Sequence, residues 1–312
     1  MKRKKLKVTV ISVGNITLGG AGKTPVVVFL AGFLKQKGCR VGVLSRGYKR
    51  KSKGVQIVSN GNSIRSHWIE AGDEPYLFAR KLPGIPVCVG KNRVSAGQHT
   101  LNTFHPDILL LDDGFQHVTL HRDIDIVAID ASNPFGNGRV LPAGPLREPL
   151  QHLKRANLFW LTRVDQADDL SALQKMLQAI QPEGGIVQST YRPIGLKCCK
   201  NREEADLSLL KGAKTILLCG IANPTSFEKT VEGLGADIIE VMAFPDHHPF
   251  TIVEMREVQN AAVSNKANLI ITTEKDGVRI PDGFEHTIPI YELIIEVCIT
   301  QGEELLERVL WN

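Results

Sequence analysis

The sequence predicts an α/β fold with a doubly wound, mostly parallel sheet and a second, smaller α/β domain. Short continuous apolar runs alternate with segments of helical spacing, a pattern typical of strands that are covered by helices on both faces. The first apolar run, Val8–Val13, leads through a glycine-rich turn into the apolar helical run Val26–Leu34. A strand, a glycine-rich turn and a helix in this order form a phosphate-binding loop, so the sheet is predicted to be of the P-loop kinase type.

The length of 312 residues and the apolar fraction of 43% suit two domains of ordinary size. The stretch Gln181–Lys211 is rich in Gly, Pro and charged residues, so we expect the domain junction there. The predicted domains are residues 1–190, which contain the phosphate loop and the catalytic residues, and residues 191–312. The terminal helix is a candidate to pack back on the first domain.

Strands of the first domain are expected, in chain order, at Val8–Val13, Arg40–Leu44, Ile85–Val89, Ile108–Leu111, Ile124–Ile129 and Asn157–Leu161. Helices are expected from Thr24, from Asp73 and over Leu170–Ile180. The Asn60-Gly61 dipeptide favours a type I′ turn and lies between two strand-like runs, Val55–Val58 and Ser63–Ile69. It therefore predicts a hairpin insertion near residues 55–69.

The second domain shows the same alternation of strands and helices. Its strands are expected at Thr215–Leu218, Ile238–Val241, Leu269–Thr272 and Leu293–Val297. Its helices are expected at Thr225–Leu234, Thr251–Ser264 and Gly302–Leu310. This pattern predicts a second, smaller α/β domain.

The glycine-rich turn contains the residues that are expected to bind the phosphates of a nucleoside triphosphate. These residues are Gly19, Gly20, Ala21, Gly22, Lys23, Thr24 and Pro25. Lys23 would reach the β- and γ-phosphates, and the Thr24 hydroxyl would bind Mg²⁺. The strict motif has Gly where this chain has Thr17, so an ordinary strand–helix turn with a surface lysine is the alternative.

Two pairs of acidic residues are candidates for the chemistry. Asp112 and Asp113 follow an apolar strand, and the carboxyl end of such a strand lies beside the phosphate loop, where carboxylates can organise Mg²⁺. A solvated Asp-Asp-Gly turn is the alternative. Asp73 and Glu74 precede a helix, where Asp is a common N-cap and Glu suits the first turn. In the second interpretation, a carboxylate of this pair acts as the base that activates the acceptor hydroxyl.

Arg46 follows the second strand, and Arg147 lies in a Pro- and Gly-rich loop. Arginine binds phosphate oxygens bidentately, but both residues can equally be surface arginines. His247, in a loop of the second domain, can relay a proton when it pairs with a carboxylate, or it can be an ordinary loop histidine. Two segments, Thr162–Asp165 and Thr273–Asp276, partly resemble the Asn-Lys-x-Asp motif that recognises guanine. Neither has the Asn, so guanine recognition is unsupported.

The composition narrows the class of protein. The net charge of +5 gives no argument for a nucleic-acid partner, and six cysteines without metal-ligand spacing indicate reduced thiols. No apolar run reaches the length that spans a bilayer, and no signal peptide precedes the first strand, so we expect no transmembrane helix. The basic residues Lys2, Arg3, Lys4, Lys5 and Lys7 form either a solvated, frayed tail or a segment that is attracted to an anionic membrane surface.

Seven segments, in order along nearly the whole chain, resemble one family closely. They are Gly14-Asn15 with Gly19–Pro25, Ser45–Tyr48, Gly72–Pro75, Asp112–His117, Pro142–Glu148, Phe244–His247 and Thr273–Asp276. Together they resemble tetraacyldisaccharide 4′-kinase, the lipid A 4′-kinase. The Asp-Asp-Gly-Phe-Gln-His segment, combined with the Arg-Gly-Tyr and Gly-Asp-Glu-Pro segments, is far more specific than a phosphate loop alone.

The resemblance implies an ATP- and Mg²⁺-dependent transferase that phosphorylates the 4′-hydroxyl of a tetraacyl glucosamine disaccharide 1-phosphate in lipid A (lipopolysaccharide) biosynthesis. It implies Asp73 as the base with His247 as its partner, and Lys23 and Arg147 as further catalytic residues. The acidic, metal-organising set that it implies, together with the Thr24 hydroxyl, is Glu74, Asp112 and Asp113. The implied substrate or transition-state contacts are Arg46, Arg147 and Glu148. The resemblance also implies a peripheral enzyme on the cytoplasmic face of the bacterial inner membrane.

One feature departs from the family. Its members usually begin with an apolar segment that seats the enzyme on the membrane, whereas here a basic tail precedes the strand expected at about Val8. We therefore expect this anchor to be missing or replaced. The alternative function is that of a P-loop GTPase acting as a switch or metal chaperone, which the missing Asn-Lys-x-Asp sequence and the Gly-Asp-Glu-Pro segment oppose. The sequence carries no signal for acyl-chain preference or oligomeric state.

Overall fold

The computed structural model describes residues 3–311, so the predicted basic residue Lys2 lies outside the described residues. The chain forms two compact units, the first made of Met1–Tyr191 with Val297–Asn312 and the second of Arg192–Glu296. Two long strands, β8 (Gly185–Cys198) and β13 (Ile290–Gln301), each contain residues of both units. The two domains predicted at residues 1–190 and 191–312 stay a prediction.

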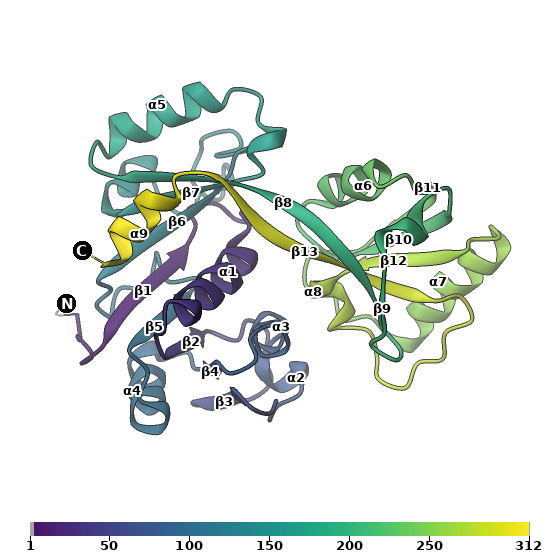
Figure 1. Ribbon diagram of the computed structural model, residues 1–312, viewed down its shortest axis with the longest axis horizontal. Coiled ribbons are helices and arrows are strands. Elements are labelled where there is room, and N and C mark those ends of the chain that lie inside the picture. Colours follow the sequence, from purple (N-terminus) through teal and green to yellow (C-terminus); the bar gives the residue numbers. More distant parts are fainter. Residues whose placement is uncertain (1–2, 312) are drawn as a thin grey trace. The chain divides into compact units, whose positions relative to one another are not determined.

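The first unit contains a sheet in the strand order β3–β4–β2–β5–β1–β6–β7–β8 (Figure 1). Neighbouring strands pair in parallel, except that β3 is antiparallel to β4. Besides β8, the strands are β1 (Thr9–Gly14), β2 (Val41–Ser45), β3 (Gln56–Asn60), β4 (Pro86–Val89), β5 (Ile108–Asp112), β6 (Ile124–Asp130) and β7 (Leu158–Thr162). The predicted parallel strands of this half are confirmed to within a few residues.

Helices cover both faces of this sheet, because alternate strand residues point to opposite sides. Ile11 and Val13 of β1 lie in a core with α1 (Lys23–Gln36), α3 (Asp73–Lys81) and α9 (Glu303–Trp311). Val10 lies in another core with α4 (Arg93–Phe104), and the β6 residues Val127 and Ile129 lie in a third with α5 (Leu170–Ile180). The predicted doubly wound, mostly parallel α/β fold is therefore confirmed.

The second unit has a smaller parallel sheet in the order β11–β10–β12–β13. Its strands, in addition to β13, are β10 (Lys214–Cys219), β11 (Asp237–Ala243) and β12 (Leu269–Thr273). Its helices are α6 (Pro224–Gly233), α7 (Ile252–Ser264) and the short α8 (Glu274–Gly277). The short strand β9 (Glu204–Ala205) pairs with the end of β8. Thr251 begins α7 with a capping box, in which its hydroxyl accepts from the Glu254 N–H and the Glu254 carboxylate accepts in return.

Residues 63–69 do not form the full second strand of the predicted hairpin: Ile64 makes an isolated bridge to Ser59, and α2 (Trp68–Ala71) begins where a strand was expected. The stretch 181–211, where the domain junction is expected, contains the 14-residue strand β8, and the boundary between the two units falls within it, after Tyr191. The N-terminal segment is not a frayed tail from Arg3 onward, because the Lys4 backbone bonds to Thr119 and His121 and the Leu6 side chain is buried. Across residues 3–311, no helix combines the length and the apolar character that crossing a membrane requires.

Candidate active site

The phosphate loop connects β1 to α1, and its last glycine has a conformation that other residues rarely adopt. Gly22 is the N-cap of α1 with φ +78°, in the left-handed region. A Cβ at this position would lie 1.9 Å from the Tyr191 hydroxyl oxygen, so side-chain space is also missing. Pro25 lies in the first turn of α1, where its missing N–H removes no helical bond. Thr17 is not among the residues with positive φ, so the strict motif's glycine is not required there.

Lys23 and Thr24, the first residues of α1, both contact acidic residues of neighbouring elements. The Lys23 ammonium donates to Oδ1 of Asn15 at 3.1 Å and lies 3.5 Å from Oδ1 of Asp113. The Thr24 hydroxyl donates to Oε1 of Glu74 at 3.2 Å. A cation and a hydroxyl at the N-terminus of this helix provide what a triphosphate with its Mg²⁺ requires.

Asp112 ends β5 and is buried behind the phosphate loop. Ser45, at the end of the adjacent β2, donates its hydroxyl to Oδ2 of Asp112 at 2.8 Å. Burial, and then the nearby charges of Glu74 and Asp113, raise the pKa of Asp112 to about 7. Oδ1 of Asp112 is buried and has no hydrogen-bond partner within residues 3–311. A buried carboxylate oxygen with a free lone pair and an elevated pKa suits a divalent cation, whose charge would favour the ionised form.

Asp113 is held between two cations. Its backbone has φ +50°, and Nη1 of Arg147 donates to both of its carboxylate oxygens, at 2.9 and 3.0 Å. Burial alone would raise the pKa of Asp113, but the charges of Lys23 and Arg147 outweigh it and lower that pKa. Asp113 is therefore ionised at neutral pH, whereas Asp112, with a pKa of about 7, is only partly ionised there.

Glu148 is the centre of a second polar cluster. Arg155 donates to its two oxygens at 2.8 and 2.9 Å, Gln116 donates at 2.9 Å, and Nδ1 of His152 lies at 2.7 Å. Burial would raise the pKa of Glu148, but these hydrogen bonds lower it. Gln116 also donates to the carbonyl of Asn15 at 2.8 Å, so the cluster is linked to the phosphate loop.

Asp73 begins α3 and is 5% exposed. One carboxylate oxygen accepts from the Glu74 N–H at 2.9 Å. The N-cap of α3 is Gly72, so Asp73 lies in the first turn, where its negative charge is favourable. Gly72 and Gly47 bring the two flanking loops into backbone contact: a Cβ at Gly72 would lie 3.1 Å from the Gly47 Cα. Arg46, one residue before Gly47, is exposed at the same edge of the sheet.

His247 belongs to the second unit, in the loop after β11. Its Nε2 lies 3.1 Å from the Lys275 ammonium, and that ammonium also contacts Asp246 at 3.3 Å. His247 has φ +61°. The predicted pairing of His247 with Asp73 stays a prediction.

Several polar residues at this edge of the first unit were not predicted as site residues: Asn15, Ser45, Arg93, Gln116 and Arg155. Asn15, Ser45 and Gln116 lie in segments that resemble the family, but no role was assigned to them. Arg93 is 3% exposed at the start of α4, and burial lowers its pKa to about 10 although Asp112 and Asp113 act in the opposite direction. The position of Arg93 just after β4 was the available signal, because carboxyl ends of parallel strands meet at one edge.

No group of three or more His, Cys, Asp or Glu side chains in the described part of the chain is arranged to hold a metal ion by itself. Mg²⁺ usually keeps several waters and binds through one or two carboxylates and the phosphates of its substrate. The oxygens of Thr24, Glu74 and Asp112 are compatible with that mode. Their assignment as ligands stays a prediction.

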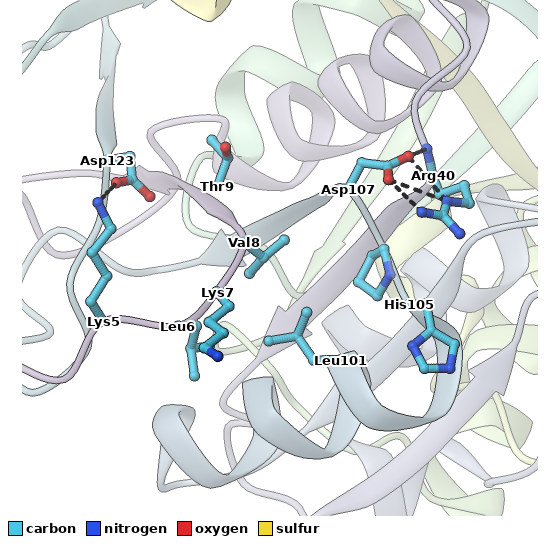
Figure 2. Close-up of a pocket in the computed structure, with 11 residues that line it drawn as sticks. Lys5, Leu6, Lys7, Val8, Thr9, Arg40, Leu101, His105, Asp107 and Asp123 are labelled. Carbon is cyan, nitrogen blue, oxygen red and sulfur yellow. Dashed lines mark hydrogen bonds and ion pairs between the residues drawn. The ribbon is translucent and has the colours of Figure 1, made fainter.

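A pocket of about 720 Å³ lies at the other end of the strands, where β1 and β5 begin (Figure 2). Figure 2 shows two ion pairs at its rim, Lys5 with Asp123 at 3.0 Å and Arg40 with Asp107 at 2.6 Å. Its lining includes no predicted site residue. The pocket therefore lies apart from the polar groups around the phosphate loop.

Comparison with known proteins shows which family the chain matches. The family model described as tetraacyldisaccharide-1-P 4′-kinase (LpxK) matches residues 1–311. A tetraacyldisaccharide 4′-kinase of an Anaeromyxobacter species is 41% identical over 97% of this chain and 82% of its own length. The enzyme of the same name from Syntrophus aciditrophicus is 40% identical over 98% of this chain and 84% of its own length.

The structural comparison gives the same result. The crystal structure of LpxK from Aquifex aeolicus in complex with ATP has a TM-score of 0.77 to this chain and 35% sequence identity. The match covers all of this chain and 91% of the other. The chain therefore belongs to the tetraacyldisaccharide-1-phosphate 4′-kinase family.

Proposed function

We propose that this protein transfers the γ-phosphate of ATP to the 4′-hydroxyl of a tetraacyl glucosamine disaccharide 1-phosphate. The observation that carries the proposal is the arrangement of Lys23 and Thr24 at the start of α1, opposite Asp113 and Glu74. Phosphoryl transfer needs positioning and charge stabilisation more than covalent chemistry, and these groups provide both. The alternative of a P-loop GTPase is not favoured, because the family match covers the chain from end to end.

ATP and Mg²⁺ are the proposed cofactors. The loop from Gly19 to Pro25 would bind the phosphates through backbone N–H groups, with Lys23 at the β- and γ-phosphates. Thr24, Glu74, Asp112 and Asp113 would hold Mg²⁺. When bound, Mg²⁺ neutralises charge on the phosphate oxygens and organises them for transfer. The unpartnered Oδ1 of Asp112 supports this assignment.

The acceptor side of the reaction is assigned to Asp73, Arg46, Arg147 and Glu148. The Asp73 carboxylate would accept the proton of the 4′-hydroxyl, with His247 as its partner. Arg147 would contact the transferring phosphoryl group, since it already binds an anion, Asp113, beside Lys23. Glu148 would orient the acceptor side through Gln116 and Arg155. Arg46 is exposed and available to the sugar or its phosphate.

The proposed partner is the cytoplasmic surface of the bacterial inner membrane, in peripheral contact. The acceptor carries four acyl chains and resides in a bilayer, so the enzyme must approach one. Arg3, Lys4, Lys5 and Lys7 are exposed and would be attracted to anionic lipid.

The test is transfer of labelled phosphate from ATP to the purified disaccharide lipid, with GTP as the competing nucleotide. We expect transfer to the lipid that requires Mg²⁺ and that ATP supports better than GTP. Nucleotide hydrolysis with a guanine preference and no lipid product would contradict the proposal.

A further inference from the structure

Three side chains outside the phosphate-loop motif contact the backbone of Gly20, Ala21 and Gly22. The Thr162 hydroxyl, at the end of β7, lies 3.3 Å from the carbonyl oxygen of Ala21 and equally 3.3 Å from that of Ile129, so these two carbonyls share its one proton. Arg163 donates from Nη1 to the carbonyl of Gly20 at 3.1 Å. The Tyr191 hydroxyl fills the space beside Gly22 that a Cβ would need.

These three side chains also contact one another or share neighbours, so they form one cluster. The Arg163 guanidinium lies 5.1 Å from the centre of the Tyr191 ring and pairs with Asp130 at the end of β6. Thr162 is fully buried, and the Arg163 side chain is 13% exposed. Thr162 ends β7, Arg163 follows it directly, and Tyr191 lies in the middle of β8, so the sheet itself fixes their positions.

The contacts determine the direction of the loop's N–H groups. A peptide unit is planar and trans, so its C=O and its N–H point in opposite directions. A carbonyl of Ala21 that is held by Thr162 therefore turns the N–H of Gly22 away from β7. Backbone N–H groups of this loop are the donors that bind phosphate, and the glycines would otherwise lose much conformational freedom on binding.

We propose that Thr162, Arg163 and Tyr191 are positioning residues that hold the phosphate loop in its binding conformation before nucleotide arrives. The identity of the nucleotide as ATP rests on the proposed function above. Pre-organisation of this kind improves affinity by reducing the ordering cost of binding. Thr162 and Arg163, the first two residues of the segment that lacks the Asn of a guanine-reading sequence, thus contact the loop backbone instead.

Hydrogen exchange of the ligand-free protein tests the proposal without any nucleotide. In Thr162→Val, which keeps the shape but loses the donor, we expect amides of the peptide that covers Gly19–Thr24 to exchange about 3–10-fold faster, the effect of one lost hydrogen bond. Tyr191→Leu should act in the same direction. Thr100→Val is the matched control, because the Thr100 hydroxyl is equally buried and donates to the carbonyl of Ala96 in α4. Unchanged exchange in both loop variants would overturn the proposal.

ATP binding and turnover give the second readout. Thr162→Val should raise the Kd and the KM for ATP by about 3–10-fold with a smaller change in kcat, and Thr162→Ser, which restores the donor, should recover the wild-type values. An equal loss in Thr162→Val and Thr100→Val would assign the effect to general destabilisation and contradict the proposal. If the wild-type protein binds no ATP, the proposed function fails, and the exchange experiment alone then decides the positioning role.

Discussion

Lys23 and Asp113 face each other at the phosphate loop, with Nζ of the lysine 3.5 Å from Oδ1 of the aspartate. Arg147 contacts the same carboxylate from another loop. One carboxylate therefore holds two cations at the place where a triphosphate is expected to bind. A bound nucleotide would offer both cations new anionic partners.

Removal of the Lys23 charge is the first prediction. Lys23→Ala should lose most phosphoryl transfer, about 10²–10³-fold in kcat/KM, because a cation is lost where negative charge develops. The protein should still fold, since this side chain contributes little apolar area to the core. Steady-state transfer kinetics measure the effect, with Lys175→Ala on the exposed side of α5 as the control. Near-normal turnover of a folded Lys23→Ala variant would remove Lys23 from the mechanism.

Position 22 requires glycine for two reasons, its positive φ and the lack of space for a Cβ, and this gives the second prediction. Gly22→Ala should abolish detectable ATP binding and lower the thermal midpoint more than Gly38→Ala does. Both positions have positive φ, +78° and +87°, which costs an L-residue about 1–2 kcal/mol. A Cβ at Gly38 meets open space, whereas one at Gly22 meets the Tyr191 hydroxyl. Calorimetry of the two variants separates the backbone strain, which both share, from the overlap of the new Cβ with Tyr191, which only Gly22→Ala has. Equal shifts of the thermal midpoint would show that this overlap has no effect.

The proposed base and its partner give the third prediction. Asp73→Ala should lower kcat by about 10²–10⁴-fold, the range for loss of a positioned proton acceptor, and His247→Ala should cost less. If the two residues act as one unit, the double variant should be little worse than Asp73→Ala. Transfer kinetics of the three variants decide this. Losses that multiply in the double variant would show that the two residues act independently.

The sequence predicted those features that depend on local pattern. The strand before Gly14 and the helix after Lys23 follow from apolar spacing, and the acidic ends of β5 and α3 follow from the placement of carboxylates after and before regular elements. The long strand β8 was missed because Pro193 and Gly195 lie within it and neither favours a strand. Hydrogen bonding to the neighbouring strands β7 and β9 stabilises β8 as a strand although its own sequence only weakly favours one.

The detailed contacts of the site depend on strand order, which no local pattern encodes. Ser45 meets Asp112 because β2 lies beside β5 with Leu44 opposite Leu111, so that the next residues of both strands are neighbours. Gln116 meets Glu148 because two irregular loops, 32 residues apart in sequence, pack on each other. Predicting the residue types at the edge of the sheet was therefore easier than predicting their partners.

The fourth prediction concerns acid stability. Burial, and then the charges of Arg93, Arg122 and Arg46, lower the pKa of His117 to about 4 from an ordinary 6.5. Between these values the unfolded chain binds more protons than the folded one, so stability rises with pH through this window and is lost as pH falls from 6.5 toward 4. Thermal midpoints of His117→Gln should therefore fall less between pH 7 and about pH 4.5 than those of the wild type. His99→Gln, at an exposed position of α4, should behave as the wild type does. If His117→Gln lost as much stability at low pH as the wild type, the lowered pKa of His117 would not be the cause of the acid sensitivity.

The last prediction concerns the basic N-terminal segment. Lys5 and Lys7 are exposed, but Leu6 between them is buried and the Lys4 backbone pairs with Thr119 and His121. A deletion of Lys2–Lys5 would therefore disturb packing as well as charge, and replacement of charge alone is the cleaner change. Each lysine near an anionic surface contributes about 1 kcal/mol, so Lys5→Gln with Lys7→Gln should weaken binding to anionic vesicles by roughly 30-fold.

Sedimentation with vesicles of anionic and of neutral lipid measures this binding. Binding of the wild type should decrease as salt is raised, because such attraction is screened over about 8–10 Å at physiological ionic strength. Activity on detergent-dispersed substrate should stay nearly unchanged, since the segment supplies no group to the proposed site. Lys175→Gln with Lys211→Gln removes equal charge from exposed positions elsewhere and should bind as the wild type does. Binding that resists high salt and survives the Lys5 and Lys7 replacements would assign membrane contact to an apolar surface instead, with the 41% exposed Ile64 as the first position to test.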